Sequence, residues 1–380
     1  MADVSNSGPE QKEPDNADEL AGLRDRIDAI DLKIGELISE RARCAKRVAA
    51  VKQSEAQGRG AGAATYYRPE REAQVLRKVM ERNTGPLTDE EMARLFREIM
   101  SACLALELPI KVAFLGPEGT FTQQAAIKHF GHSADCVPMA VIDEVFREVE
   151  AGAANYGVVP VENSTEGVVN HTLDNFMESN LKICGEVELR IHQHLLVSEV
   201  TNTDHITRIY SHSQSLAQCR KWLDSHYPQA ERIAVNSNAE AAKRIKGEWN
   251  SAAIAGEMAA ELYDLKILSE KIEDQPDNST RFLVIGTEEV SASGCDKSSI
   301  VVSMRNKPGA LHDLLEPFQR NKVDLTRVET RPSHSGAWNY VFFIDFAGHQ
   351  DSDEVHAALQ AVGERASDLK VLGSYPKAVL

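Results

Sequence analysis

The sequence has 380 residues, of which 42 are basic and 58 acidic, for a formal net charge of −16 at pH 7. That length allows two or three domains with separate cores, and the acidic excess argues against nucleic-acid binding, which needs a basic surface. The sequence contains no apolar run of membrane-spanning length, and its six cysteines form no CxxC pair or other metal-ligand pattern. We therefore expect a soluble, cytoplasmic protein with reduced thiols and no metal, membrane or nucleic-acid partner.

The first part of the chain predicts a polar leader followed by helices only. Residues 1–17 lack the basic-then-apolar pattern of a signal peptide, which indicates a disordered leader. Residues 18–108 predict a helical domain, in which Thr88 and Glu91 have the spacing of a capping box at a helix start. The helices are expected at 18–53, at about 69–83 and from 88 onward.

Three cations lie on the apolar stripe of the first predicted helix. Residues such as Leu20 and Val48 recur there at helical spacing, and Arg24, Arg41 and Lys52 each follow a member of the stripe by three or four residues. A buried cation costs several kcal/mol unless an anion meets it. The pattern therefore indicates either salt bridges within the protein or a bound anionic ligand.

The spacing of these cations separates one of them from the other two. Arg41 and Lys52 are 11 residues apart, which is about three turns and an angular offset of about 20°, so they can converge on one dianion. Arg24 and Arg41 are 17 residues apart, roughly 25 Å along the axis and about 100° around it. If all three serve one kind of site, Arg24 must reach the site of another copy, which predicts a homodimer.

Residues of this helical domain match a known family. The matching segments resemble the all-helical chorismate mutases, which rearrange chorismate to prephenate by a pericyclic step without a covalent intermediate. Such a step depends on holding the compact conformer and on stabilising charge at the ether oxygen. The matching segments are Leu23-Arg24, Ser39-Glu40-Arg41, Val51-Lys52, Arg71-Glu72 and Arg94-Leu95-Phe96. The resemblance implies a substrate site of Arg24, Arg41, Lys52, Arg68, Arg71, Glu72, Cys103 and Glu107.

The resemblance also implies roles within that site. Arg41 and a second copy's Arg24 would bind carboxylates, Lys52 and Glu107 would face the ether oxygen as the catalytic pair, and Glu72 would contact the ring hydroxyl. Arg68 stands where many members have a short polar or acidic side chain, and Glu107 where some have glutamine. Because only a protonated carboxyl group can donate a hydrogen bond to the ether oxygen, we expect mutase activity to rise as pH falls.

Residues 110–288 predict an α/β domain, because short apolar runs alternate with helical segments. Polar loops adjoin these runs, and in open α/β sheets such loops gather into the ligand crevice at the carboxyl ends of the strands. Taken singly, each loop is also consistent with a turn or a helix cap. The loops cover residues 116–120, 160–167, 211–215 and 278–282.

Together these loops resemble the prephenate dehydratases, with Thr280-Arg281-Phe282 as the most specific match. That family has two α/β lobes around a cleft, similar to type II periplasmic binding domains. It converts prephenate to phenylpyruvate with loss of carbon dioxide and the ring hydroxyl. The resemblance implies that Thr280 hydrogen-bonds the departing hydroxyl as the catalytic contact and that Arg281 binds a carboxylate. The cleft is expected to contain Glu162, Asn163, Ser164, Ser211, Gln214, Thr280, Arg281 and Phe282.

The remainder predicts a linker at 289–298 and a ferredoxin-like βαββαβ domain at 299–377. Its segments around Gly309 and Thr330 resemble the ACT regulatory domain of the dehydratases, which usually pairs between chains and binds phenylalanine. Gly309 allows close backbone approach, and the helix start after it offers free N–H groups to a carboxylate. Thr330 stands where serine is usual and retains the hydroxyl. The implied effector residues are Asn306, Gly309, Ala310, Leu311, Glu329, Thr330, Arg331 and Pro332.

The three parts have the order found in enzymes that join the two activities. The resemblance implies a homodimer or higher homo-oligomer with chorismate and prephenate as substrates, phenylalanine as effector and no cofactor. A mutase fused to a prephenate dehydrogenase would need a GxGxxG loop after a strand, and no such spacing occurs. The other alternative is a non-catalytic amino-acid sensor, against which Thr280 and Arg281 argue. His192 and His194 could share a strand face, but no nearby carboxylate or cysteine has metal-ligand spacing with them.

Overall fold

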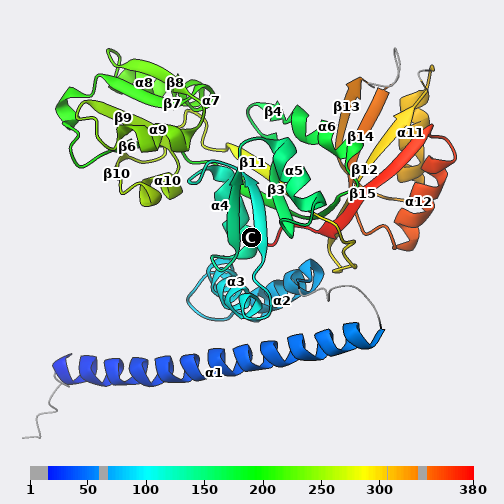
Figure 1. Cartoon of the computed structure of the whole chain (residues 1–380), viewed down its shortest axis with the longest axis horizontal. Coiled ribbons are helices and arrows are strands. Elements are labelled where there is room, and N and C mark those ends of the chain that lie inside the picture. The colour runs from blue at the N-terminus through cyan, green and yellow to red at the C-terminus, as the bar shows by residue number, and fades with distance from the viewer. Residues whose placement is uncertain (1–15, 60–66, 306, 333–339) are drawn as a thin grey trace, which may run out of the picture. The chain divides into compact units, whose positions relative to one another are not determined.

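The computed structural model describes residues 16–59, 67–305, 307–332 and 340–380 (Figure 1). The chain forms two compact units, Met1–Ala64 and Thr65–Leu380. No helix in the described ranges combines the length and the apolar character needed to cross a bilayer.

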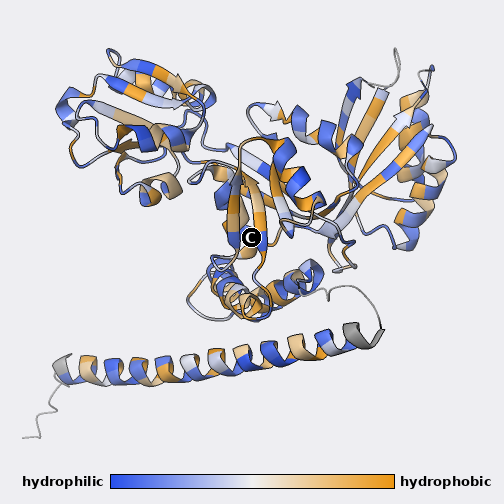
Figure 2. Ribbon diagram, in the orientation of Figure 1, coloured by the Kyte–Doolittle hydropathy of each residue, from blue (hydrophilic) through white to orange (hydrophobic). Residues whose placement is uncertain are grey.

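The described part of the first unit is one long helix, α1 (Asn16–Arg59), which confirms the helix predicted at 18–53 and extends it at both ends. Asp18 and Glu19 lie in its first turn, where negative charge stabilises the helix dipole. Apolar residues recur along the helix (Figure 2). They are nevertheless exposed: Leu23, Ile27 and Ile34 retain 49%, 55% and 48% of their accessible surface. The stripe predicted to face an interior is therefore not covered by any other described part of this unit.

The second unit begins with the helices α2 (Pro69–Arg82) and α3 (Asp89–Ala105), which pack against each other. The predicted capping box is confirmed: the Glu91 N–H donates to Thr88 Oγ1 at 3.2 Å, and the Thr88 N–H donates to Glu91 Oε2 at 2.9 Å. Leu76 and Ala93 are buried. Arg97 of α3 donates to the Lys128 carbonyl at 3.0 Å, which ties the helical pair to the α/β domain.

The first α/β lobe is built on a mixed sheet with the order β2-β1-β3-β11-β5, and β4 pairs with β3. β1 is parallel to β2 and β3, whereas β11 is antiparallel to β3 and β5. Helices pack on this sheet around two cores, one of which includes Phe146 and the other Phe114. The elements are β1 (Lys111–Leu115), α4 (Phe121–Phe130), β2 (Asp135–Met139), α5 (Ile142–Glu150), β3 (Tyr156–Asn163), β4 (Gly167–Val168), α6 (Asn170–Glu178), β5 (Lys182–Arg190) and β11 (Ser279–Gly286).

The second lobe has its own sheet, with the order β10-β6-β9-β7-β8. The chain enters this lobe after β5 and returns before β11, so two crossings connect the lobes (Figure 1). This arrangement confirms the predicted two-lobed domain. The elements are β6 (His194–Val197), η1 (Thr203–His205), β7 (Arg208–His212), α7 (Ser213–Gln218), α8 (Arg220–His226), β8 (Glu231–Val235), α9 (Asn238–Ile245), β9 (Ser251–Ala255), α10 (Glu257–Leu262) and β10 (Lys266–Ser269).

The C-terminal sheet is antiparallel, with the order β13-β14-β12-β15, and its element order confirms the predicted βαββαβ pattern. Strand β12 begins at Asp296, inside the segment 289–298 that the sequence predicts as a linker. Ser298 of this segment is a buried strand residue whose hydroxyl bonds Ser374 at 2.7 Å, and the next residue, Ser299, bonds Asp345 at 2.6 Å. The elements are β12 (Asp296–Met304), α11 (Ala310–Arg320), β13 (Leu325–Pro332), β14 (Tyr340–Ala347), α12 (Asp353–Gly363) and β15 (Asp368–Pro376).

One face of this C-terminal sheet packs directly on the first lobe. A single core joins Phe176 of α6 to Phe343 of β14 and Tyr375 of β15. Gly373 of β15 comes so close to β5 that a Cβ atom there would lie 2.4 Å from the Ile183 carbonyl oxygen. Only glycine permits this backbone approach, which places the C-terminal sheet against the strands of the first lobe.

Candidate active site

Thr280 and Asn163 lie opposite each other in the antiparallel pair β11/β3. Asn163 Nδ2 donates to Thr280 Oγ1 at 2.8 Å. Asn163 Oδ1 accepts the backbone N–H groups of Thr165 and Glu166, each at 3.0 Å. Since those donors require an oxygen, the amide nitrogen must face Thr280. Thr280 Oγ1 is the acceptor in this bond, so its own hydrogen remains for donation to a second partner.

Asn278 connects this pair to the second lobe. Its side chain is buried, with 2% of the residue exposed, and its Oδ1 accepts from Asn163 Nδ2 at 3.0 Å and from Thr165 Oγ1 at 3.3 Å. Its Nδ2 donates to Gln218 Oε1 of α7 at 3.1 Å. Asn278 belongs to the predicted loop 278–282, but no motif assigned it a role. Its position two residues before Thr280, on the same side of an extended chain, was the available signal.

The second lobe holds Ser211 and Gln214. Ser211 is fully buried, and its hydroxyl lies 2.7 Å from the Ile254 carbonyl oxygen and 3.0 Å from Asn238 Oδ1. Asn238 also bonds Ser215 at 2.9 Å through its Nδ2. Ser211 therefore stabilises the segment 211–215 through buried hydrogen bonds, whereas Gln214 is half-buried in the first turn of α7. Asn238, at the start of α9, is a central residue that the sequence motifs did not reveal.

A cavity of 290 Å³ lies between the lobes next to Asn278. This volume is near the lower end of the range of small-molecule sites. Ser164 is exposed nearby, and its hydroxyl accepts the Ser279 N–H at 2.9 Å. The cavity is lined by Thr165, Glu166, Ala217, Gln218, Lys221, Glu273, Asp274, Gln275 and Asn278. Lys221 is the basic residue of this lining, and no sequence motif indicated it.

The structure does not bring Arg281 to Thr280. Its Nε lies 2.9 Å from Glu186, its Nη1 lies 2.5 Å from Asp345, and its Nη2 donates to the Tyr375 hydroxyl at 2.9 Å. Burial alone would lower the pKa of Arg281, but Tyr375, Asp345 and Glu186 together raise it above its ordinary value. The guanidinium is thus held by the C-terminal sheet and by β5.

Two other residues predicted for the cleft also lie elsewhere. Glu162 pairs with Arg327 of β13, with Oε2 3.0 Å from Nε. Phe282 is buried in the core of the first lobe with Phe114 and Val158. A motif shows that residues are neighbours in sequence, but the face of the sheet on which each side chain lies depends on strand pairing.

The candidate mutase residues fall on both units. On α1, Arg24 is exposed, whereas Arg41 and Lys52 are half-buried. In the second unit, Arg71 is exposed on α2 and Cys103 is buried on α3.

Three further mutase candidates adjoin α2 and α3. Arg68 precedes α2 and pairs with Glu70 at 2.7 Å, and Glu107 is half-buried after the end of α3. Glu72 Oε1 lies 3.2 Å from Arg97 Nε. Burial raises the pKa of Glu72, and the Arg97 charge partly opposes that shift.

The predicted effector segments lie on α11 and β13, while Asn306 is outside the described residues. Gly309 begins α11 with a φ of 84°, a left-handed conformation that favours glycine. Ala310 and Leu311 follow in the first turn. Along β13, Glu329 and Arg331 alternate with the more exposed Thr330 and Pro332. Arg331 Nη2 lies 3.0 Å from Asp174 on α6.

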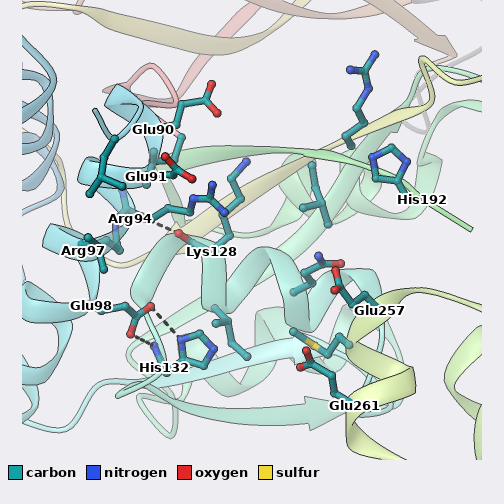
Figure 3. Close-up of a pocket in the computed structure, with 18 residues that line it drawn as sticks. Glu90, Glu91, Arg94, Arg97, Glu98, Lys128, His132, His192, Glu257 and Glu261 are labelled. Atoms are coloured by element: carbon teal, nitrogen blue, oxygen red, sulfur yellow. Dashed lines mark hydrogen bonds and ion pairs between the residues drawn. The ribbon is translucent and has the colours of Figure 1, made fainter. Parts of the chain in front are cut away.

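A larger hollow of 1030 Å³ lies between α3, α4 and α10, away from the predicted site residues (Figure 3). Glu98 bonds His132 at 2.9 Å on one side, and Glu257 lies across from them (Figure 3). His192 also lines it, but its Nδ1 bonds Glu273 at 2.8 Å. Within the described ranges, no group of three histidine, cysteine or acidic residues could hold a metal ion.

Two α/β lobes around a polar cavity, fused to a ferredoxin-like sheet, define an enzyme with separate catalytic and regulatory domains. Family models match the chain in three places: chorismate mutase type II at residues 23–108, prephenate dehydratase at 112–290 and ACT domain at 298–364.

Relatives match nearly the whole length. The chain is 69% identical over 363 residues to the bifunctional chorismate mutase/prephenate dehydratase of Pseudomonas aeruginosa, which covers 96% of this chain and 99% of the relative. It is 51% identical over 359 residues to the enzyme of that description from Neisseria gonorrhoeae, covering 94% and 97%. A crystal structure of prephenate dehydratase from Arthrobacter aurescens in complex with L-Phe is 33% identical, with a TM-score of 0.66 and coverage of 70% of this chain and 90% of that one. The chain belongs to the bifunctional chorismate mutase/prephenate dehydratases.

These comparisons confirm the predicted fold classes and the prediction of an enzyme that joins a mutase and a dehydratase with an ACT domain. The roles of individual residues and the oligomeric state stay predictions.

Proposed function

We propose that the helical domain rearranges chorismate to prephenate and that the cleft between the lobes converts prephenate to phenylpyruvate. The observation that carries the second step is the Thr280–Asn163 bond of 2.8 Å, which a further bond from Asn163 connects to Asn278 in the wall of a polar cavity. In that step the bond between the ring and its carboxylate breaks, and carbon dioxide leaves. The electron pair of the broken bond moves into the ring, which becomes aromatic as the ring hydroxyl departs. The departing hydroxyl needs a hydrogen-bond donor, which Thr280 supplies.

The surrounding amides make Thr280 a better donor than an isolated hydroxyl. Asn163 donates to Thr280 Oγ1, and hydrogen bonds in a chain polarise one another. Asn278 holds Asn163 and reaches Gln218 in the other lobe, so the lobes share one network. Because Arg281 is engaged elsewhere, Lys221 in the cavity wall is the better candidate for a substrate carboxylate.

For the mutase step we propose that Arg41 and Lys52 of one chain act with Arg24 of a second copy. The exposed apolar stripe of α1 supports this arrangement, because a second copy would remove those side chains from water. Glu107 and Lys52 would stabilise charge on the ether oxygen. Arg68, Arg71, Glu72 and Cys103 complete the proposed substrate site.

We further propose phenylalanine as the effector, bound near Gly309 and the segment 329–332. The ACT domain match and the relative crystallised with L-Phe support this assignment. The expected cytoplasmic location stays a prediction.

A coupled assay for phenylpyruvate formed from chorismate tests the two catalytic steps. Thr280→Ala should lower dehydratase activity at least about 100-fold and leave prephenate to accumulate, because the mutase step does not use this hydroxyl. Thr203→Ala, an exposed threonine of the second lobe, is the matched control. Comparable loss of both activities in Thr280→Ala would refute separate sites. Calorimetry with phenylalanine tests the effector, and absence of binding would exclude it.

A further inference from the structure

Glu162 and Arg281 lie back to back with the proposed catalytic pair. In the β3/β11 register, Arg281 is opposite Glu162, one position beyond Thr280 and Asn163. Successive side chains on a strand point to opposite faces. Thr280 and Asn163 contact each other, whereas Arg281 and Glu162 contact the C-terminal sheet β13-β14-β12-β15, which we call the regulatory sheet.

The regulatory sheet presents a complementary pair. Arg327 of β13 lies opposite Asp345 of β14. Arg327 Nε is 3.0 Å from Glu162 Oε2, and Asp345 Oδ2 is 2.5 Å from Arg281 Nη1. Neighbours on each sheet and partners across the interface therefore all have opposite charge. We call Glu162, Arg281, Arg327 and Asp345 the ion-pair quartet.

Most of the quartet is shielded from water. The side chains of Arg281, Asp345 and Arg327 are 16%, 7% and 12% exposed, and Glu162 is 40% exposed. Removing one partner of such a pair leaves an uncompensated charge, so the pairs resist separation. Glu186 and Tyr375 fix the Arg281 guanidinium further. The backbone next to Thr280 is thereby tied to the regulatory sheet.

Strand β13 connects the quartet to the proposed effector segment. Arg327 and Arg331 lie four residues apart on one face of this strand, and each pairs with a carboxylate of the first lobe. Because the strand backbone is shared, a displacement of residues 329–332 by an effector would act on Arg327 as well.

We propose that Glu162 and Arg281 are positioning residues, not substrate ligands, and that effector binding reaches Thr280 and Asn163 through the ion-pair quartet. The quartet holds β3 and β11 in the register that aligns Thr280 with the departing hydroxyl. The regulatory part of this proposal rests on phenylalanine being the effector, whereas the positioning part does not.

A double-mutant cycle on the full-length enzyme tests the positioning role. Glu162→Gln and Arg327→Gln should each lower the dehydratase kcat about tenfold with little change in KM, because misalignment slows the step without removing substrate contacts. The double variant should lose no more than the worse single variant, since both changes break the same pair. Arg327→Lys should retain kcat within about twofold, because it keeps the charge. Arg208→Gln, which breaks an ion pair with Glu248 in the second lobe, is the matched control.

Phenylalanine then tests the regulatory role on the same variants. Glu162→Gln and Arg327→Gln should bind phenylalanine by calorimetry yet need about tenfold more of it for half inhibition. The positioning role would be overturned if the losses in kcat of the two single variants added up in the double variant. It would also be overturned if Glu162→Gln raised KM while Arg327→Gln left kcat and KM unchanged. Unchanged inhibition in both variants would overturn the regulatory role. If the wild type bound no phenylalanine, the effector assignment would fail, while the kinetic cycle would still decide the positioning role.

Discussion

The long helix and the two-lobed domain differ in how much of a site one chain contains. In the two-lobed domain, strand register brings Thr280 to Asn163, and Asn278 reaches Gln218 across the lobes, all within one unit. α1 instead presents an exposed apolar stripe on which Arg24 lies too far from Arg41 for both to bind one small ligand. Strand pairing can assemble a polar site from distant residues of one chain. A single long helix must share its site with another element or another copy.

Mixing two inactive variants tests this difference most directly. Arg24→Ala and Arg41→Ala should each lower mutase activity at least about 100-fold, because each removes a carboxylate contact from every site. In a dimer that shares sites, a mixed dimer has one intact site and one doubly altered site. Random exchange therefore restores about a quarter of the wild-type mutase activity. Differently tagged chains, exchanged and then assayed with chorismate, provide the measurement.

The dehydratase provides the control for that experiment. Mixing Thr280→Ala with Asn278→Ala chains should restore nothing beyond the average of the two, because both residues belong to one chain's cleft. Recovery of dehydratase activity in this mixture would contradict a cleft formed within one chain. If the chains exchange but mutase activity does not recover, the mutase site is not shared between chains.

The sequence predicted elements whose determinants are local. The capping box of Thr88 and Glu91 and the helix of α1 follow from residues near each other in the chain. The direction of Arg281 could not be predicted, because Asp345 lies 64 residues away and the register of β11 with β3 shifts directly after Arg281. Side-chain direction in a sheet depends on such long-range pairing.

Polar residues in the interior were the other source of error. Ser298 belonged to the stretch that favoured a linker, yet its hydroxyl bonds Ser374 on β15, and this bond compensates its burial. Asn238 could not be predicted either, because its role is to hydrogen-bond Ser211 and Ser215, which become its neighbours only in the folded chain.

The pH dependence of the mutase should differ from that of the dehydratase. If protonated Glu107 donates to the ether oxygen, mutase kcat should rise as pH falls, by up to about tenfold per pH unit above the pKa of Glu107. Glu107→Gln should flatten this profile, because an amide donates at any pH. The dehydratase profile should be the same in both enzymes. An unchanged mutase slope in Glu107→Gln would exclude this role.

A smaller effect is expected where the helical pair meets the first lobe. His129 of α4 bonds the Tyr67 hydroxyl at 3.0 Å, and burial, with a contribution from the Arg97 charge, lowers the pKa of His129 from 6.5 to about 3. Between these values the unfolded chain binds a proton that the folded protein excludes, so stability falls as pH falls below 6.5. The slope is at most about 1.4 kcal/mol per pH unit from this residue.

Urea unfolding at pH 7 and pH 5 measures that contribution. His129→Gln keeps an acceptor for Tyr67 but does not titrate, so it should lose about 1–2 kcal/mol less stability than the wild type between the two pH values. His132→Gln replaces an exposed histidine that pairs with Glu98 and serves as the control. Equal losses in the wild type and in His129→Gln would show that His129 is protonated in the folded protein. The contact with Tyr67 would then not exclude water, and the junction between α2, α3 and α4 would be looser than that between the lobe and the regulatory sheet.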